Sequence, residues 1–169
     1  MMSAQNPPNN EFMAVRVFDA PRERVWQAWS RADNLQHWWG PKGCKLRVVK
    51  FDFRPGGHFH YAMEYSTGAT MFGRFFYREI AAPERISWIN SFANASGGIV
   101  RAPFSEHCPL EMSNVMTLNE TGGKTTLDLR STAHGANADE QIYFNELFGS
   151  MQQGFSGTFD QLADFLARS

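Results

Sequence analysis

The sequence has little net charge, few cysteines and no long apolar run. Its 169 residues include 16 basic and 17 acidic side chains, which leave a net charge of −1. This balance argues against nucleic-acid binding, which usually requires a basic face. No apolar run approaches the roughly 20 residues of a membrane-spanning helix. We therefore expect neither nucleic acid as a partner nor a membrane span.

The chain also lacks the residue patterns of a disulfide framework or a metal site. Cys44 and Cys108 lie far apart, and no phosphate-binding glycine loop or HExxH-type run is present. We expect reduced thiols, a cytoplasmic location, no metal and no cofactor. Residues 1–10 lack the features of a signal peptide and are expected to form a disordered tail, followed by one domain over residues 11–169.

Alternating and helical patterns predict an α+β order of elements. They indicate a strand over residues 11–18 (alternating around Met13, Val15 and Val17), a short helix over 22–29, and a second helix to Trp38 that begins with a capping box at Ser30. Six strands follow, over residues 46–53 (with a bulge near Val49), 58–65, 70–80, 85–92, 110–119 and 124–132. Tight turns between them imply an antiparallel meander.

The chain is expected to close with one long helix over residues 137–169, which Asn137 and Glu140 cap. Its apolar stripe runs through Tyr143, Leu147, Met151, Phe155, Phe159, Leu162 and Leu166. Gly154 and Gly157 interrupt this pattern, and each costs about 1 kcal/mol relative to alanine. We expect both to lie where the helix approaches the sheet or the short helices most closely.

Several motifs in this order resemble one known family. They are Ala20-Pro21, Val25-Trp26, Trp38-Trp39-Gly40-Pro41, Arg54-Pro55-Gly56-Gly57, Tyr77-Arg78-Glu79-Ile80, Pro83-Glu84-Arg85-Ile86, Gly122-Gly123-Lys124-Thr125-Thr126, and the segment from Gly154 to Leu162. Together they resemble the family of homologues of the activator of the heat-shock protein ninety ATPase, in the START-like (SRPBCC) superfamily. This resemblance implies the helix-grip (START-like, Bet v-like) fold: a curved antiparallel sheet wrapped around a long C-terminal helix, with two short helices after the first strand. It also implies a cavity between sheet and helix.

His58 and His60 alternate with Phe59 and Tyr61 along one predicted strand. Two imidazoles on one strand face, with Glu64 nearby, could hold a metal or act in acid–base chemistry. Because the aromatic face is expected to point inward, we expect both histidines to point to solvent.

Aromatic residues make up 14% of the chain, which favours a ligand pocket over a closed core built from Leu, Ile and Val. We expect a small hydrophobic or aromatic ligand, lipid- or polyketide-like, without assuming catalysis. The predicted ligand-binding residues are Trp38, Phe59, Tyr61, Met63, Phe75, Tyr77, Trp88, Asn90, Asn114, Met116, Met151, Gln152 and Phe155. Two alternatives stay open: a polyketide cyclase- or dehydratase-like enzyme that uses a cavity His, Tyr or Glu, and an interaction module like the chaperone ATPase activators. The sequence also leaves a homodimer open.

Overall fold

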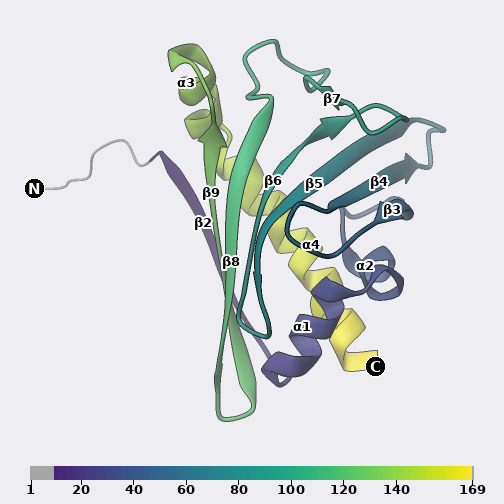
Figure 1. Ribbon diagram of the computed structural model, residues 1–169, viewed down its shortest axis with the longest axis vertical. Coiled ribbons are helices and arrows are strands. Elements are labelled where there is room, and N and C mark those ends of the chain that lie inside the picture. Colours follow the sequence, from purple (N-terminus) through teal and green to yellow (C-terminus); the bar gives the residue numbers. More distant parts are fainter. Residues whose placement is uncertain (1–9, 169) are drawn as a thin grey trace, which may run out of the picture.

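The computed structural model describes residues 10–168, so the predicted tail lies outside the described residues except for Asn10. Figure 1 shows the elements along the chain. They are β2 (Glu11–Phe18), α1 (Arg22–Ser30), α2 (Ala32–Trp38), β3 (Cys44–Phe51), β4 (His58–Tyr65), β5 (Thr70–Ala81), β6 (Arg85–Ala93), β7 (Ile99–Val100), β8 (Glu111–Thr121), β9 (Lys124–His134), α3 (Ala138–Glu146) and α4 (Phe148–Arg168).

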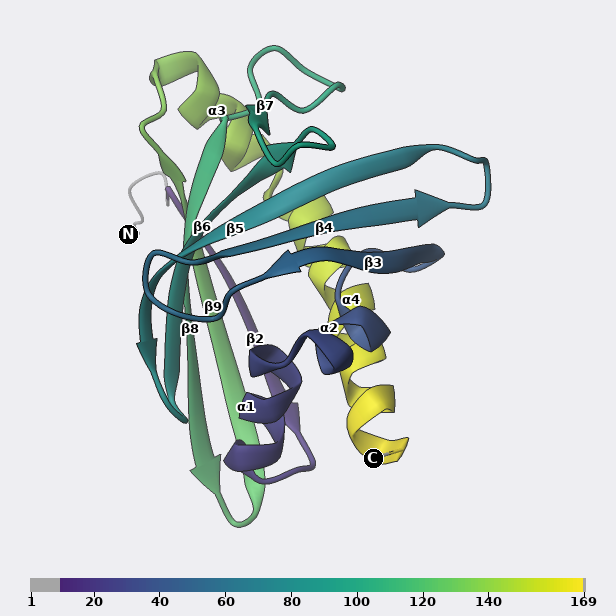
Figure 2. The same cartoon turned by 45° about the vertical axis from the view of Figure 1, so that its right-hand side comes forward.

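The strands form one antiparallel sheet in the order β2-β9-β8-β6-β5-β4-β3, and the two-residue β7 pairs with β6. The sheet curves around α4, and α1 and α2 lie together at one end (Figures 1 and 2). There α2 packs between β3 and α4, and α1 packs against α4, β8 and β9. This is the predicted helix-grip fold. No helix within residues 10–168 is long and apolar enough to cross a membrane.

The first strand is confirmed, but its apolar alternation faces outward. Met13, Val15 and Val17 are about half exposed, whereas Phe12 and Phe18 are buried on the opposite face. A period of two predicts a strand without saying which face is covered. Both faces of β2 carry apolar residues, so the pattern alone did not decide between them.

The two short helices pack as a pair, without the predicted capping box. Val25, Trp26 and Trp29 are buried on α1 as expected. Ser30 is the last residue of α1, and the residue before α2 is Arg31, whose side chain makes no capping hydrogen bond. The prediction of a cap at Ser30 was therefore wrong, because that residue completes the preceding helix.

The predicted closing helix is divided at Leu147, where α3 ends and α4 begins. The capping box of Asn137 and Glu140 is confirmed, with the Glu140 backbone N–H 2.8 Å from Asn137 Oδ1. Next to the break, Phe148 contacts both Phe144 and Phe12, at ring-centroid distances of 5.3 and 5.7 Å. One uninterrupted helix to residue 169 was therefore the wrong prediction, and Ser169 itself lies outside the described residues.

The predicted apolar stripe is buried only in the C-terminal half of α4, at Phe159, Leu162 and Leu166. The expected role of the helix glycines is not confirmed either. A methyl group at Gly154 would have no atom within 4 Å, and one at Gly157 would lie 3.4 Å from the Lys42 side chain in the loop before β3. Neither glycine lets α4 approach the sheet.

Many of the aromatic residues fill the space between α1, α2 and the inner face of the sheet. Trp29 lies 4.9 Å from Trp38 and 5.6 Å from Trp88 between ring centroids, and Phe75 stacks on Trp88 at 4.9 Å. Offset and edge-to-face contacts of this kind add stability beyond the area that they bury. Much of the aromatic surplus is therefore packed core.

Candidate ligand-binding site

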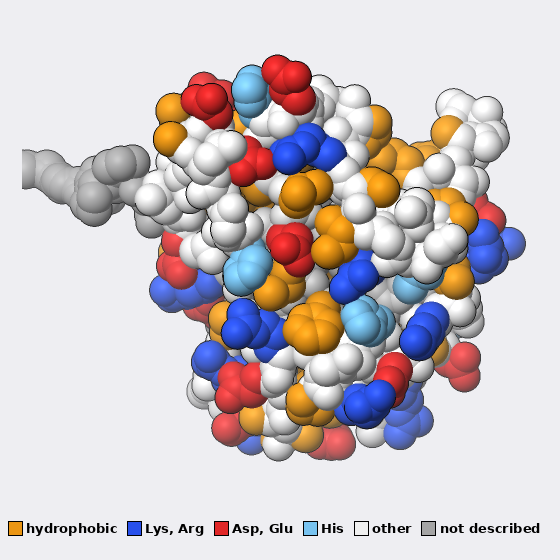
Figure 3. Space-filling model, turned by 45° about the horizontal axis from the view of Figure 1, so that its top comes forward, with side chains coloured by type: hydrophobic (Ala, Val, Ile, Leu, Met, Phe, Trp, Pro, Cys, Tyr) orange, Lys and Arg blue, Asp and Glu red, His pale blue; other side chains and the backbone are white. Residues whose placement is uncertain are grey.

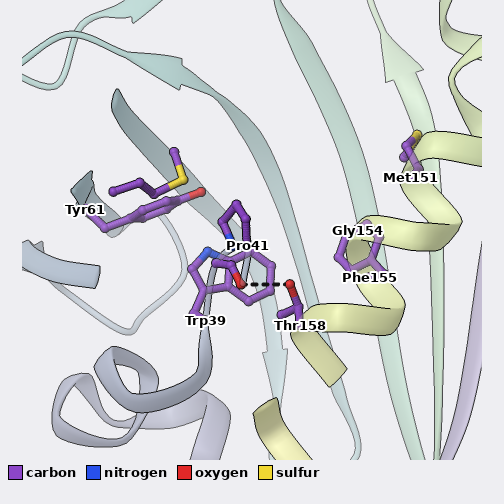
Figure 4. Close-up of a pocket in the computed structure, with 9 residues that line it drawn as sticks. Trp39, Pro41, Tyr61, Met151, Gly154, Phe155 and Thr158 are labelled. Atoms are coloured by element: carbon purple, nitrogen blue, oxygen red, sulfur yellow. Dashed lines mark hydrogen bonds between the residues drawn. The ribbon is translucent and has the colours of Figure 1, made fainter. Parts of the chain in front are cut away.

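Two cavities lie on the inner face of the sheet and share Pro41, Tyr61 and Met63. The first, here called the helix cavity, has a volume of about 210 Å³ and lies between α4, the loop after α2, and β4 (Figure 4). Its lining consists of Trp39, Gly40, Pro41, Tyr61, Met63, Met151, Gly154, Phe155 and Thr158. The second, the loop cavity, has about 310 Å³ and is lined by Pro41, Tyr61, Met63, Tyr65, Met71, Gly73, Asn90, Ser91, Phe92, Pro103 and Phe104.

Side chains from one turn of α4 attach this helix to the end of α2 and to the loop that follows it, next to the helix cavity. Thr158 Oγ1 donates a hydrogen bond to the Gly40 carbonyl at 2.9 Å, and Gln161 Nε2 donates to the carbonyls of Gly40 and Trp38 at 2.9 and 3.0 Å. Toward the C-terminus from this turn, α4 buries Leu162 and Leu166 in the core. Toward its N-terminus, Met151 is only partly buried and Gly154 carries no side chain. The lining there consists of the flexible Met151, the Gly154 backbone and the Phe155 ring.

Tyr61 forms the floor between the two cavities. Its ring lies against Gly73 of β5, the residue opposite it in the sheet. Burial raises the pKa of the Tyr61 phenol to about 12, while a hydrogen bond from Trp39 acts in the opposite direction. The phenol therefore keeps its proton at neutral pH and offers a hydrogen-bond donor inside a mostly apolar cavity.

Asn90 gives the loop cavity a polar side chain, and hydrogen bonds from buried residues on the neighbouring strands fix its orientation. Asn114 Nδ2 donates to Asn90 Oδ1 at 2.6 Å, and the Ser131 hydroxyl donates to Asn114 Oδ1. Asn114 and Ser131 are buried. Within residues 10–168, no protein acceptor takes a hydrogen bond from Asn90 Nδ2. The cavity thus presents an amide donor that is held in place by a buried network.

The structure brings five of the predicted residues to these cavities. Tyr61, Met63, Met151 and Phe155 line the helix cavity, and Asn90 lines the loop cavity with Tyr61 and Met63. Asn114 lies behind Asn90. The remaining buried members are at most 2% exposed and line neither cavity; they are Trp38, Phe59, Phe75, Tyr77, Trp88 and Met116.

Gln152 corrects one expectation and Trp39 was overlooked. Gln152 was expected to be a buried amide under the helix, but it is exposed, because it follows Met151 by about 100° around α4. Trp39 lines the helix cavity, whereas its neighbour Trp38 is buried and donates to the Ala28 carbonyl at 3.0 Å. The motif Trp38-Trp39-Gly40-Pro41 was the sequence signal from which Trp39 could have been predicted. Pro41 and Thr158 were missed in the same way.

The two strand histidines lie on the outer face of the sheet, and Phe59 and Tyr61 lie on the inner one, as predicted. His60, however, is buried instead of pointing to solvent, because the loop after β6 covers it and its Nε2 lies 3.1 Å from the Asn94 carbonyl oxygen. Within residues 10–168, no group of three or more His, Cys, Asp or Glu side chains could hold a metal ion.

Comparison with known proteins gives a family and a set of similar folds. The family model described as "Activator of Hsp90 ATPase homolog 1-like protein" matches residues 19–167. Protein Ms6760 from Mycobacterium smegmatis is 26% identical, with 92% of this chain and 90% of that chain covered and a TM-score of 0.74. A protein from Arthrobacter aurescens is 24% identical, with 99% and 92% covered and a TM-score of 0.79.

A more distant structure has the same fold. DynU16, a protein in the dynemicin biosynthetic locus, is 18% identical, with a TM-score of 0.66. The alignment covers 95% of this chain but only 48% of DynU16. No curated protein matches the sequence.

Proposed function

This chain belongs to the Activator of Hsp90 ATPase homolog 1-like family, and we propose that it binds a small hydrophobic or aromatic ligand, lipid- or polyketide-like, between the sheet and α4. The observation that carries the proposal is the pair of cavities that meet at Tyr61. Ligand pockets are typically concave and mostly apolar, with a few polar groups that fix orientation. Here those polar groups are the Tyr61 hydroxyl and the Asn90 amide.

The geometry indicates which ligand chemistry fits. Met63, Met151 and Phe155 offer flexible or flat apolar surfaces, which adapt to rings and alkyl chains. Both polar groups present donors, so a ligand with a carbonyl or ether oxygen would satisfy them. The ligand is therefore expected to be mainly apolar and to carry acceptor oxygens. The two free cysteines agree with the expected reducing, cytoplasmic setting.

The test uses a neutral fluorescent probe, N-phenylnaphthylamine, and a library of lipids, flavonoids and polyketides. The probe is expected to gain emission on binding and to raise the melting temperature by mass action. Met151→Trp should weaken probe affinity by about tenfold, because the indole fills space at the cavity wall. Met13→Trp, the same change on the exposed outer face of β2, should leave affinity unchanged.

Two results would contradict the proposal. One is a wild-type protein that shows no emission change and no thermal shift with the probe or any library member. The other is equal loss of affinity in the two tryptophan variants.

A cyclase- or dehydratase-like reaction is the second candidate, because Tyr61 places an ionisable hydroxyl at both cavities. With its pKa raised to about 12, this phenol is protonated at neutral pH and would act as a proton donor, although a weak one. Tyr61→Phe separates the two functions. If the protein is a carrier, the variant retains most of its binding; if Tyr61 donates a proton in a reaction, the variant binds substrate but turns it over far more slowly.

The interaction alternative has one observation in its favour, the exposed row of Met13, Val15 and Val17 on β2. Three scattered apolar side chains on one strand are a smaller surface than a stable protein interface needs. We therefore keep ligand binding as the proposal, and sedimentation of the wild-type protein would show whether two copies associate at all.

A further inference from the structure

A third cavity lies on the outer face of the sheet, away from the proposed ligand site. It has about 210 Å³ and is lined by Lys50, His58, His60, Arg74, Ser96 and Gly97. Side chains alternate along β4, so His58 and His60 lie on the outer face of this strand. Tyr61 and Met63, which line the two inner cavities, lie on its other face. Figure 3 shows a face of the molecule on which His side chains lie beside Lys and Arg side chains. We propose that this outer cavity binds a phosphate-type oxyanion.

The basic groups are aligned by the register of three neighbouring strands. Lys50 on β3 is opposite His60 on β4, and His60 is opposite Arg74 on β5. The register therefore places the Lys50 ammonium and the Arg74 guanidinium on either side of His60. An anion lying over this row would interact favourably with both charges.

The described protein does not supply that negative charge. No carboxylate lines the cavity, and Lys50 and Arg74 form no ion pair within residues 10–168. Asp52 is the acidic residue whose charge acts on His58, but its carboxylate lies 2.9 and 3.0 Å from Arg54 Nε. The charges of Lys50 and Arg74 are thus left uncompensated.

The donors are partly held in place by the loop after β6. Arg74 Nη1 donates to the Gly97 carbonyl at 3.0 Å, and His60 Nε2 lies 3.1 Å from the Asn94 carbonyl oxygen. The first contact fixes the Arg74 side chain while leaving its other guanidinium N–H groups available. Together with the Lys50 ammonium and the Ser96 hydroxyl, donors come from β3, β5 and the loop. Such a convergent set of donors suits an oxyanion, and phosphate offers it more acceptor oxygens than a carboxylate does.

The size and electrostatics of the cavity agree with this ligand. A water molecule takes roughly 30 Å³ in the liquid, so the cavity holds several waters or one oxyanion of five heavy atoms. Burial, and then the charges of Arg74 and Lys50, lower the pKa of His58, while Asp52 acts in the opposite direction. A bound oxyanion would oppose the lowering and raise the pKa of His58.

The experiment titrates the full protein with inorganic phosphate against chloride at matched ionic strength. Phosphate is expected to raise the melting temperature more than chloride does, and to shift the NMR signals of the His58 and His60 rings. Lys50→Gln should weaken phosphate binding by about tenfold, as expected for loss of a charge-assisted contact. Lys45→Gln, on the same exposed strand but outside the cavity, should leave binding unchanged.

Vesicles that contain phosphatidic acid distinguish the source of the phosphate. Binding of inorganic phosphate supports a free anion, and binding only to these vesicles, lost in Lys50→Gln, supports a lipid headgroup. The proposal is overturned if neither form produces a response, or if Lys50→Gln and Lys45→Gln respond alike. The inorganic phosphate arm uses no apolar probe and is therefore independent of the ligand site around Tyr61, and dependence on Lys50 assigns vesicle binding to the outer cavity.

Discussion

Gly73 lies so close beneath the ring of Tyr61 that a methyl group at Gly73 would stand 2.5 Å from the phenol oxygen. The two residues are directly opposite each other on β5 and β4. The missing side chain at Gly73 therefore sets how deeply the Tyr61 ring can sit, and with it the floor of both inner cavities.

Gly73→Ala is expected to lower the free energy of unfolding by about 1–3 kcal/mol, because the added methyl group overpacks the contact. Urea denaturation measures this change. Tyr61→Leu combined with Gly73→Ala should cost less than the sum of the two single changes, since the shorter side chain removes the clash. If the two losses in free energy of unfolding were strictly additive, the contact between Tyr61 and Gly73 would not be the cause of the Gly73→Ala destabilisation.

Gly154→Ala is expected to raise the free energy of unfolding by about 0.5–1 kcal/mol, because alanine favours the helix and the methyl group meets nothing within 4 Å. Gly68→Ala is the control. Its methyl group would also find open space, but the residue has a φ of +90°, which alanine tolerates poorly. Opposite shifts in melting temperature are expected, and a destabilised Gly154→Ala would argue against the open geometry.

Glu140 should make stability depend on pH. The Asn137 backbone N–H, and then Arg101, hold the pKa of this carboxyl below its ordinary value of 4.5. Because the folded pKa is lower, the contribution is fully present above pH 4.5 and is lost as pH falls through the folded pKa. Glu140→Gln is expected to cost about 1 kcal/mol at neutral pH, and the difference from wild type should shrink in acid.

Urea denaturation at neutral pH and at about pH 3 measures this dependence. Glu146→Gln, at an exposed glutamate of the same helix, is the matched control and should show a much smaller change. A Glu140→Gln penalty that stays constant across this range would mean that the cap, and not the charge, carries the effect.

Asn114→Ala is expected to lower the free energy of unfolding by about 2 kcal/mol or more. The change leaves the buried Ser131 hydroxyl and the Asn90 carbonyl oxygen without their partner. Asn90→Ala should cost less, because Asn90 is only half-buried and its amide opens to the loop cavity. Denaturant titration of both variants measures which one loses more free energy of unfolding. Equal losses would contradict the role of Asn114 at the centre of the buried network.

The sequence predicted the fold better than the site, for a physical reason. Period and capping are local, so the strand of His58 and the cap of Asn137 could be read from neighbouring residues. Whether an inward side chain fills the core or borders a cavity depends on what lies opposite it. Trp88 and Tyr61 both face inward, yet Trp88 stacks on Phe75 whereas Tyr61 borders both cavities.

The same distinction explains the errors in the closing helix. The apolar stripe is continuous in sequence, but a stripe does not report the distance between the helix and the sheet. That distance depends on contacts such as the hydrogen bond from Thr158 to the Gly40 carbonyl, which joins residues far apart in the chain. Gln152 and Gly154 lie beyond this attachment and are exposed.

The bulge at Val49 determines which residues at the end of β3 face the inner side of the sheet and which face the outer side. Before it, Leu46 and Val48 pair with the inward-facing Met63 and Tyr61; after it, Lys50 pairs with the outward His60 and Phe51 with the inward Phe59. If Val49 paired in regular alternation instead, it would take the outward position opposite His60, and Lys50 would move to the inward position opposite Phe59. The ammonium would then enter the aromatic core and the phenyl ring of Phe51 would turn to the outer surface, so one extra residue in the strand keeps both faces of the protein intact.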